Sequence, residues 1–446
     1  MKTKKRYTAE ILPLVILLVL LAGFAAAEEA ETLTLQQALD MAGNNNPALL
    51  ASRQRWIEKQ RSIAITNGWP NPEFGIMLED IPSGGGKPMM YEYSLSQEIM
   101  APAKLIAMRN MAKSEAGMAG ADFSVKQLEV YTAVKQAYYD LLYAERSLAI
   151  MKENQGLMEH LVNITQTNYS HGTSPLQETL RAQAEISRMA VEIQNMTAMT
   201  AAARNRLNYL LGISANTPLT VEEIFTAIPP DFEFTALQNT AQNSPAIASM
   251  TWELEMARNN VSMAKSQFWP DFKLNFSFVQ STVMDPMLMK MVDTRLNRAD
   301  YSLEMREVNR NSWKVGFMVM LPIWFGQYKA KAASAQAGVT AAQALVSDMR
   351  NMVGMELSMA LNEAQSAWRL IGLYQNTVIP QAEQAYQASM VDYTNGKTDF
   401  MAALDGLVTL RNARLDYYKS RVDYEKALAY LEQLTGKPIA TDSPQP

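Results

Sequence analysis

Histidine and cysteine, the side chains that most often carry catalysis and metal binding, are nearly absent from this chain. His160 and His171 are its only histidines, and it has no cysteine. Carboxylates are plentiful, but they fall on predicted helix faces, where a carboxylate is ordinarily solvated. An enzyme needs a nucleophile, an acid–base pair or a metal set that converges in a cleft. The sequence therefore predicts neither an enzyme nor a bound cofactor, with both histidines at the surface.

Thioethers are the one chemical group present in excess, because the chain has 30 methionines. Four of them stand close together at Met284, Met287, Met289 and Met291. Thioether sulfur is a soft ligand that suits Cu(I) or Ag(I), and the last three alternate, so an extended chain would place them on one face. Methionine is also an adaptable packing residue. The stretch is thus either a soft-metal site or ordinary packing.

The rest of the chain repeats one plan twice. Tyr169 and Gly172 return 224 residues later as Tyr393 and Gly396, whereas Trp69 returns 200 residues later as Trp269. The second copy therefore carries about 24 extra residues, which include the methionine stretch, and repeats of this size determine the fold. The pattern predicts a first repeat over 28–240, a second over 241–437 and a loose tail over 438–446.

The N-terminus has the features of a secretory signal peptide over residues 1–27. Basic residues precede an apolar run, and a small-residue cleavage site at 25–27 follows it. No later segment offers 18 uninterrupted apolar residues, which argues against an inner-membrane helix. The formal net charge of −5 at pH 7 argues against a nucleic-acid partner.

Two β-hairpins are predicted, at about 71–99 and about 270–323. In both, apolar and polar residues alternate, as in Phe272, Leu274 and Phe276. Each strand should be about ten residues long, which is enough for a tilted strand to cross a bilayer. Four strands cannot close a barrel, and an open edge is not viable in lipid. Either the hairpins form a soluble sheet, or three chains pool twelve strands into one barrel.

Long helical hairpins are predicted over 103–212 and 325–436, joined by a linker at 213–240. The chain has no proline between Pro102 and Pro175, so the first helix should run for about 60 residues, or roughly 90 Å. Many alanines permit close, coiled-coil-like packing. Pro380 should kink or break the second long helix.

This doubled arrangement over residues 31–437 resembles the TolC-type outer-membrane factors, which also share Tyr-x-x-Gly at the helical turns. The resemblance implies an α+β membrane protein with two internal repeats. Three copies would form a 12-stranded β-barrel, with four strands per chain, continuous with a long α-helical coiled-coil tunnel in the periplasm. It further implies the outer membrane of a Gram-negative bacterium, a periplasmic adaptor and an inner-membrane pump, most simply of the RND type.

The resemblance also suggests functional residues. In the family, acidic side chains near the second turn narrow the periplasmic entrance. Asp405 stands at one such position here, Asp399 lies nearby, and the second acidic position is Ala402. A solvated surface role for Asp405 remains open. The resemblance makes the two turns adaptor contacts, through the following residues: Tyr169, Gly172, Tyr393 and Gly396.

The sequence thus predicts the outer-membrane channel of a tripartite efflux system. The stretch Pro70-Asn71-Pro72-Glu73-Phe74 looks like the heavy-metal branch of the family, and the methionines favour the same reading. A multidrug or type I secretion conduit is the alternative. More remote alternatives are a periplasmic coiled-coil adaptor and a structural coiled-coil protein.

Overall fold

The computed structural model describes residues 31–66, 68–81, 83–85, 87–226, 228–293 and 298–439, and for 284–304 we discuss only the backbone. The predicted signal peptide at 1–27 and most of the predicted tail lie outside the described residues. In chain order the elements are β1 (Glu31–Leu33), α2 (Leu35–Asn45), α3 (Pro47–Ile65), β2 (Glu73–Glu79), β3 (Met90–Ile99), α4 (Pro102–Ser170), α5 (Leu176–Leu211), β4 (Leu219–Val221), α6 (Phe234–Ala241), α7 (Pro245–Ser266), β5 (Asp271–Asp293), β6 (Arg298–Met320), α8 (Phe325–Leu373), a π-helical segment (Tyr374–Val378), α9 (Ile379–Thr394) and α10 (Phe400–Thr435).

These elements form two compact bodies, each drawn from separated parts of the chain. The helical body contains residues 31–51, Ser124–Ser244 and 353–439. The sheet body contains Ser52–Phe123 and Pro245–Met352. Helices α3, α4 and α8 contribute residues to both bodies. Both bodies therefore take residues from both halves of the sequence.

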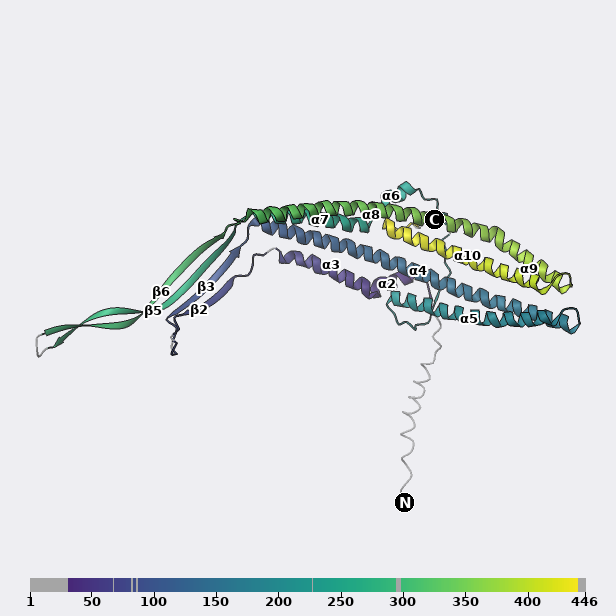
Figure 1. The fold of residues 1–446 in the computed structure, drawn as a ribbon, viewed down its shortest axis with the longest axis horizontal. Coiled ribbons are helices and arrows are strands. Elements are labelled where there is room, and N and C mark those ends of the chain that lie inside the picture. Colours follow the sequence, from purple (N-terminus) through teal and green to yellow (C-terminus); the bar gives the residue numbers. More distant parts are fainter. Residues whose placement is uncertain are drawn as a thin grey trace, which may run out of the picture. The chain divides into compact units, whose positions relative to one another are not determined.

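The predicted long helices are present, and local sequence explains their ends. Helix α4 has 69 residues, or about 100 Å at the α-helical rise. It begins at Pro102, where the missing N–H of proline costs nothing. Helix α5 returns antiparallel to it and ends at Gly212, which adopts the left-handed conformation (φ 71°) that suits glycine (Figure 1).

Pro380 interrupts the second long helix, as the sequence predicts. Helix α8 ends at Leu373, a five-residue π-helical segment follows, and α9 begins at Ile379 with the proline in its first turn. Proline lacks the N–H that would continue the α-helical ladder. The π-helical segment lies directly before this proline, where the α-helical ladder is interrupted.

Two apolar cores hold the helical body together. The first joins α2, α4, α5 and the strands β1 and β4, around Tyr138, Leu141 and Leu211. The second joins the far ends of the helical hairpins, around Met158, Phe400 and Leu407. Residues at helical spacing from α4, α5 and α10 enter these cores, as packed amphipathic helices require.

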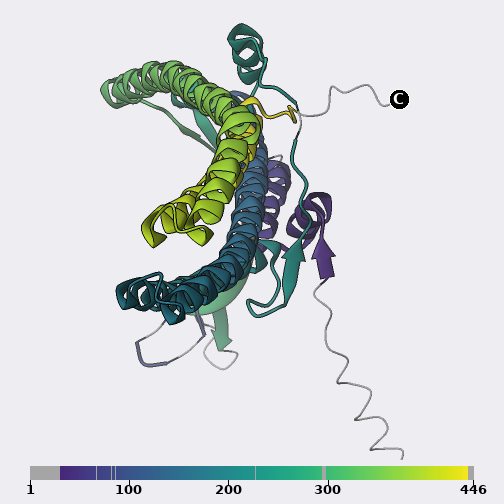
Figure 2. The ribbon, with the colours of Figure 1, turned by 90° about the vertical axis from the view of Figure 1, so that its right-hand side faces the viewer.

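A short parallel pair, β1 with β4, closes the first core (Figure 2). The Tyr138 hydroxyl donates to the carbonyls of Leu33 (3.1 Å) and Glu222 (2.8 Å) and so ties the pair to α4. Burial raises the pKa of Tyr138 to about 12. The hydroxyl therefore remains a donor at any physiological pH.

The sheet body contains one antiparallel sheet with the strand order β2-β3-β5-β6. The predicted strand length of about ten residues is right for β3, which has 10, but wrong for β5 and β6, which have 23 each. The extra residues of the second repeat do not form a loop. They extend β5 and β6 as a two-stranded ribbon that is paired from Met284↔Glu307 to Asp293↔Arg298. This pairing supplies hydrogen-bond partners for backbone N–H and C=O groups beyond the four-stranded sheet.

Candidate functional site: helical turns, an acidic helix face and a two-faced sheet

The two helical turns have the same backbone geometry. At the first, Gly172 (φ 73°) donates its N–H to the Tyr169 carbonyl at 2.9 Å. At the second, Gly396 (φ 69°) donates to the Tyr393 carbonyl at 3.1 Å. A side chain at either glycine would be strained in this left-handed conformation. The repeated Tyr-x-x-Gly pattern is thus a compact helix end, and its role as an adaptor contact stays a prediction.

The two tyrosines of these turns have opposite environments. Tyr169 is 45% exposed, whereas Tyr393 is only 3% exposed. The Tyr393 hydroxyl donates to the Glu178 carboxylate of α5 at 3.0 Å, and its ring lies edge-on to Phe400. Burial, together with the bond and charge of Glu178, raises the pKa of Tyr393. Tyr393 therefore links the second helical hairpin to the first, while Tyr169 lies on the surface.

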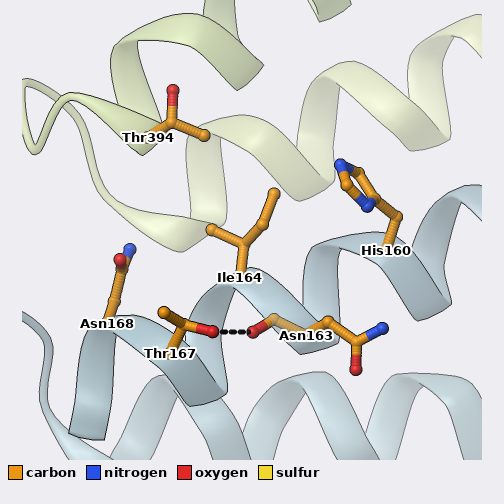
Figure 3. Close-up of a pocket in the computed structure, with 6 residues that line it drawn as sticks. All are labelled: His160, Asn163, Ile164, Thr167, Asn168 and Thr394. Atoms are coloured by element: carbon orange, nitrogen blue, oxygen red, sulfur yellow. Dashed lines mark hydrogen bonds between the residues drawn. The ribbon is translucent and has the colours of Figure 1, made fainter. Parts of the chain in front are cut away.

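Small hollows lie between the hairpins near these turns. One of about 220 Å³ is lined by His160, Asn163, Ile164, Thr167, Asn168 and Thr394. Figure 3 shows His160 and Ile164 projecting from α4 toward the side of Thr394. A second hollow of about 360 Å³ includes His171, Glu178 and Tyr393 in its lining. Both histidines are exposed, as predicted.

The two acidic residues predicted for a gate do different things in the structure. Asp399 begins α10, and its carboxylate accepts the backbone N–H of Ala402 at 3.0 Å. Asp405 is exposed on the next turns of α10, between the buried Ala403 and Leu407. No hydrogen bond or ion pair engages Asp405 within the described residues. Asp399 is thus a helix cap, and Asp405 is the carboxylate available to solvent.

A buried carboxylate anchors the linker between the two halves of the chain, which the sequence did not predict. Glu425 of α10 is 4% exposed and accepts hydrogen bonds from the backbone N–H and hydroxyl of Thr226 and from the Tyr139 hydroxyl. The Arg421 guanidinium lies 4.0 Å from the Phe225 ring centroid. Burial raises the pKa of Glu425 despite these bonds. No local pattern marks this glutamate, because its partners are far away in sequence.

The sheet has one apolar and one polar face. Cross-strand register places Leu95, Phe276 and Val315 in one row on the first face. On the other face Lys273 donates to Glu73 at 2.9 Å, and Lys314 donates to Glu92 at 3.2 Å. The outer sides of β2 and β6 have no strand partner within the described chain. This is the arrangement of a membrane strand set with a polar interior.

The predicted metal residues Met284, Met287, Met289 and Met291 belong to the long ribbon. Register places them opposite Glu307, Glu304, Ser302 and Asp300 in turn. Their side chains lie outside what the structure describes, so their metal role stays a prediction. In the described part of the chain, no group of three or more histidine, aspartate or glutamate side chains is arranged to hold a metal.

Comparison with known proteins determines the family. A model described as outer membrane efflux protein matches residues 38–213 and 236–437. The chain belongs to this family. This outer membrane efflux protein is 23% identical over 411 residues to the cobalt-zinc-cadmium resistance protein CzcC of Cupriavidus metallidurans, a match that covers 92% of this chain and 91% of CzcC.

Solved structures with the same fold include two outer-membrane or transmembrane channels. The Campylobacter jejuni CmeC outer membrane channel aligns with a TM-score of 0.74 at 16% identity, over 92% of this chain and 87% of that one. CusC, whose structures concern transmembrane channel formation, aligns with a TM-score of 0.74 at 15% identity, over 90% and 92%. Family and fold confirm the predicted class, an outer-membrane efflux channel with a large periplasmic part.

The described helices are not membrane spans. None of them combines the length and the apolar character that a bilayer crossing requires.

Proposed function

We propose that this protein is the outer-membrane conduit of a tripartite efflux system that expels heavy-metal cations. The similarity to CzcC, which extends over nearly the whole of both chains, carries the substrate proposal. A tube conducts without chemistry, so the protein needs a hydrated path, a closed wall in the membrane and an entrance that can be narrowed. The predicted repeats, 28–240 and 241–437, would supply these parts twice per chain.

Closure of the wall requires other copies of the chain. The sheet ends in β2 on one side and β6 on the other, and these strands are antiparallel to each other in direction. A ring in which β6 of each copy pairs with β2 of the next leaves no open edge in lipid. Three copies give twelve strands, an even number in the known range. The homotrimer is therefore part of the proposal.

The helical body offers surfaces for the same assembly. Helix α5 exposes Leu180, Val191 and Tyr209. Within this body, α8 exposes Met355 and Met359. Exposed apolar rows on long helices are typical of faces that pack against another chain. Since the chain has no cysteine, engineered cysteine pairs between β2 and β6 would report cross-links between copies without background.

The helical turns are the proposed adaptor contacts, through Tyr169 and Gly172 of the first and Tyr393 and Gly396 of the second. Both turns are compact, and their backbone geometry is nearly identical. Two similar ends on each of three copies would present six docking positions to an adaptor, in two sets of three, and a compact turn fits a narrow groove. The inner-membrane pump, most simply of the RND type, would act through this adaptor.

Asp405 is the proposed gate carboxylate, with Asp399 as a secondary contributor. In a trimer, three exposed Asp405 side chains would repel one another and attract cations at the entrance. Asp405→Ala should raise single-channel conductance at low voltage or weaken block by divalent cations. Asp399→Ser removes the second charge but keeps a capping side chain, so it separates charge from helix stability. Unchanged traces for Asp405→Ala on both counts would refute the gate role.

The ribbon methionines Met284, Met287, Met289 and Met291 are proposed as a soft-metal contact outside the membrane. The ribbon continues past Ser281, where pairing between β3 and β5 stops. Calorimetric titration with Cu(I) should lose a binding event in the Met287→Leu/Met289→Leu variant. Equal binding by both proteins would make these residues ordinary packing.

The first experiment is a toxin panel on a deletion strain, with complementation by the intact gene. The panel includes copper, silver, zinc, cobalt and cadmium salts, a dye, a bile salt and several antibiotics. Hypersensitivity confined to metals is the expected result. Hypersensitivity confined to organic compounds would overturn the metal proposal and favour a multidrug or secretion conduit.

A further inference from the structure

Two neighbouring methionines of β6 lie on the polar face of the sheet, where packing does not account for them. Met318 and Met320 of β6 are 60% and 46% exposed. Because side chains alternate along a strand, these two methionines share the polar face with Lys314 and Gly316, whereas Phe317 and Val319 lie on the apolar face. Methionines that fill cores in this protein are enclosed, as Met158 and Met189 are. The side chains of Met318 and Met320 instead reach the side of the sheet that carries charge.

The two thioethers stand close enough to share a ligand. Residues two apart on a strand are about 7 Å apart at Cα on one face, and methionine has three flexible side-chain torsions. Direct cross-strand neighbours have Cβ atoms about 5 Å apart. The neighbour of Met320 is Asp271, and that of Met318 is Lys273.

The charges beside the pair are arranged to tolerate a cation. The Lys273 ammonium donates to Glu73 at 2.9 Å, so its charge is already compensated. The Asp271 Oδ2 atom accepts from Lys104 at 2.6 Å. The other oxygen, Asp271 Oδ1, is buried, and no donor of the described residues reaches it. A buried carboxylate oxygen without a partner is costly, so a cation or water bound beside it would be stabilising.

We infer that Met318 and Met320, with Asp271 Oδ1, form a binding site for a soft monovalent cation, Cu(I) or Ag(I), on the polar face of the sheet. Thioether sulfur selects such ions over hard divalent cations, and Asp271 Oδ1 supplies an oxygen that has no other partner among the described residues. The site lies where β5 begins and β6 ends, next to Trp269 and Trp324 in sequence. A search for histidine, cysteine and carboxylate groups alone would overlook it.

This inference rests on the proposed function, because it takes the polar face as the wall of the conduit. A cation that passes along the polar face would meet this site where β5 begins and β6 ends. Water would compete with the thioethers for the ion, so the ion would be bound only transiently. Conduction requires binding that is weak enough for release.

The test is site-resolved oxidation of the full-length protein in lipid vesicles. Peroxide converts exposed methionine to its sulfoxide, and peptide mass spectrometry reports each position separately. With silver nitrate in chloride-free buffer, Met318 and Met320 should be protected, whereas Met77 of β2, which is 57% exposed on the same face, should oxidise at an unchanged rate. In Met318→Leu, Met320 should lose its protection, and Asp271→Asn should weaken protection at both. Leucine preserves volume, so these variants should fold.

Conductance of the same vesicles separates the proposed cation site from the proposed function as a conduit. Conducting vesicles with equal oxidation of Met318, Met320 and Met77 in the presence of silver would overturn the site alone. Protection that persists at Met320 in Met318→Leu would overturn the paired site. Vesicles that never conduct would overturn the proposed function, whatever the oxidation pattern.

Discussion

The two bodies of this protein use aromatic residues in opposite ways. In the helical body, Tyr138 and Tyr393 are buried, and the hydroxyl of each has an acceptor. The sheet body exposes Trp313, Phe317 and Trp324 instead. A buried hydroxyl requires a partner, whereas an exposed aromatic face requires an apolar environment. Internal hydrogen bonds and packing therefore determine the structure of the helical body, whereas the sheet requires an apolar environment around its exposed aromatic face.

The largest expected effect tests the interior of the helical body. Leu407 is fully enclosed in the second core, so Leu407→Ala should lower the free energy of unfolding by about 2–5 kcal/mol. Val391 of α9 is exposed, and Val391→Ala should change the free energy of unfolding by no more than about 0.5 kcal/mol. Urea unfolding of the two variants measures the difference. Equal losses would mean that the core does not control stability.

The next prediction tests the apolar face of the sheet. Val315 is exposed on that face, so Val315→Arg should destabilise the protein in lipid vesicles by about 2–4 kcal/mol. Ser312 is exposed on the opposite, polar face, and Ser312→Arg should be tolerated. Urea titration of protein refolded into vesicles gives both values. A larger loss for Ser312→Arg would reverse the assignment of the faces.

A smaller effect distinguishes the two turns. Tyr393→Phe removes the hydrogen bond to Glu178 and should cost about 1 kcal/mol. Tyr169→Phe removes a surface hydroxyl and should cost almost nothing, since no intramolecular bond to it appears among the described residues. Hydrogen exchange at the ends of α5 and α10 should increase only in Tyr393→Phe. Equal hydrogen exchange in the two variants would contradict the predicted difference between the buried Tyr393 and the exposed Tyr169.

The smallest expected effect is a pH dependence in the helical body. Burial holds the pKa of Glu425 above its ordinary value of 4.5. The folded state therefore binds this proton more tightly than the unfolded state, and stability declines as pH rises from 4.5 through the raised pKa. Glu425→Gln should remove that part of the slope, whereas Glu363→Gln, at an exposed position, should not. Urea midpoints across this pH range provide the measurement, and parallel curves for wild type and Glu425→Gln would rule out the effect.

Local sequence features predicted much of the fold. Pro102 and Gly212 mark helix ends, Pro380 marks the interruption of the second long helix, and both glycine turns lie where the pattern places them. These features act within a few residues through backbone conformation. The predicted length of β5 and β6 was wrong, because pairing between the two strands, and not the alternation within either one, decides how far the ribbon extends.

The candidate site divides in the same way. Sequence spacing determined that Tyr169 and Tyr393 would occupy equivalent turns and that Asp405 would follow the second, since these are relations along one helix or turn. Only the tertiary structure decided that Tyr393 is buried against Glu178 and that Glu425 anchors the linker. It also placed Asp271 beside Met320. Burial and partnership between residues far apart in the chain depend on packing in three dimensions, and no local pattern encodes them.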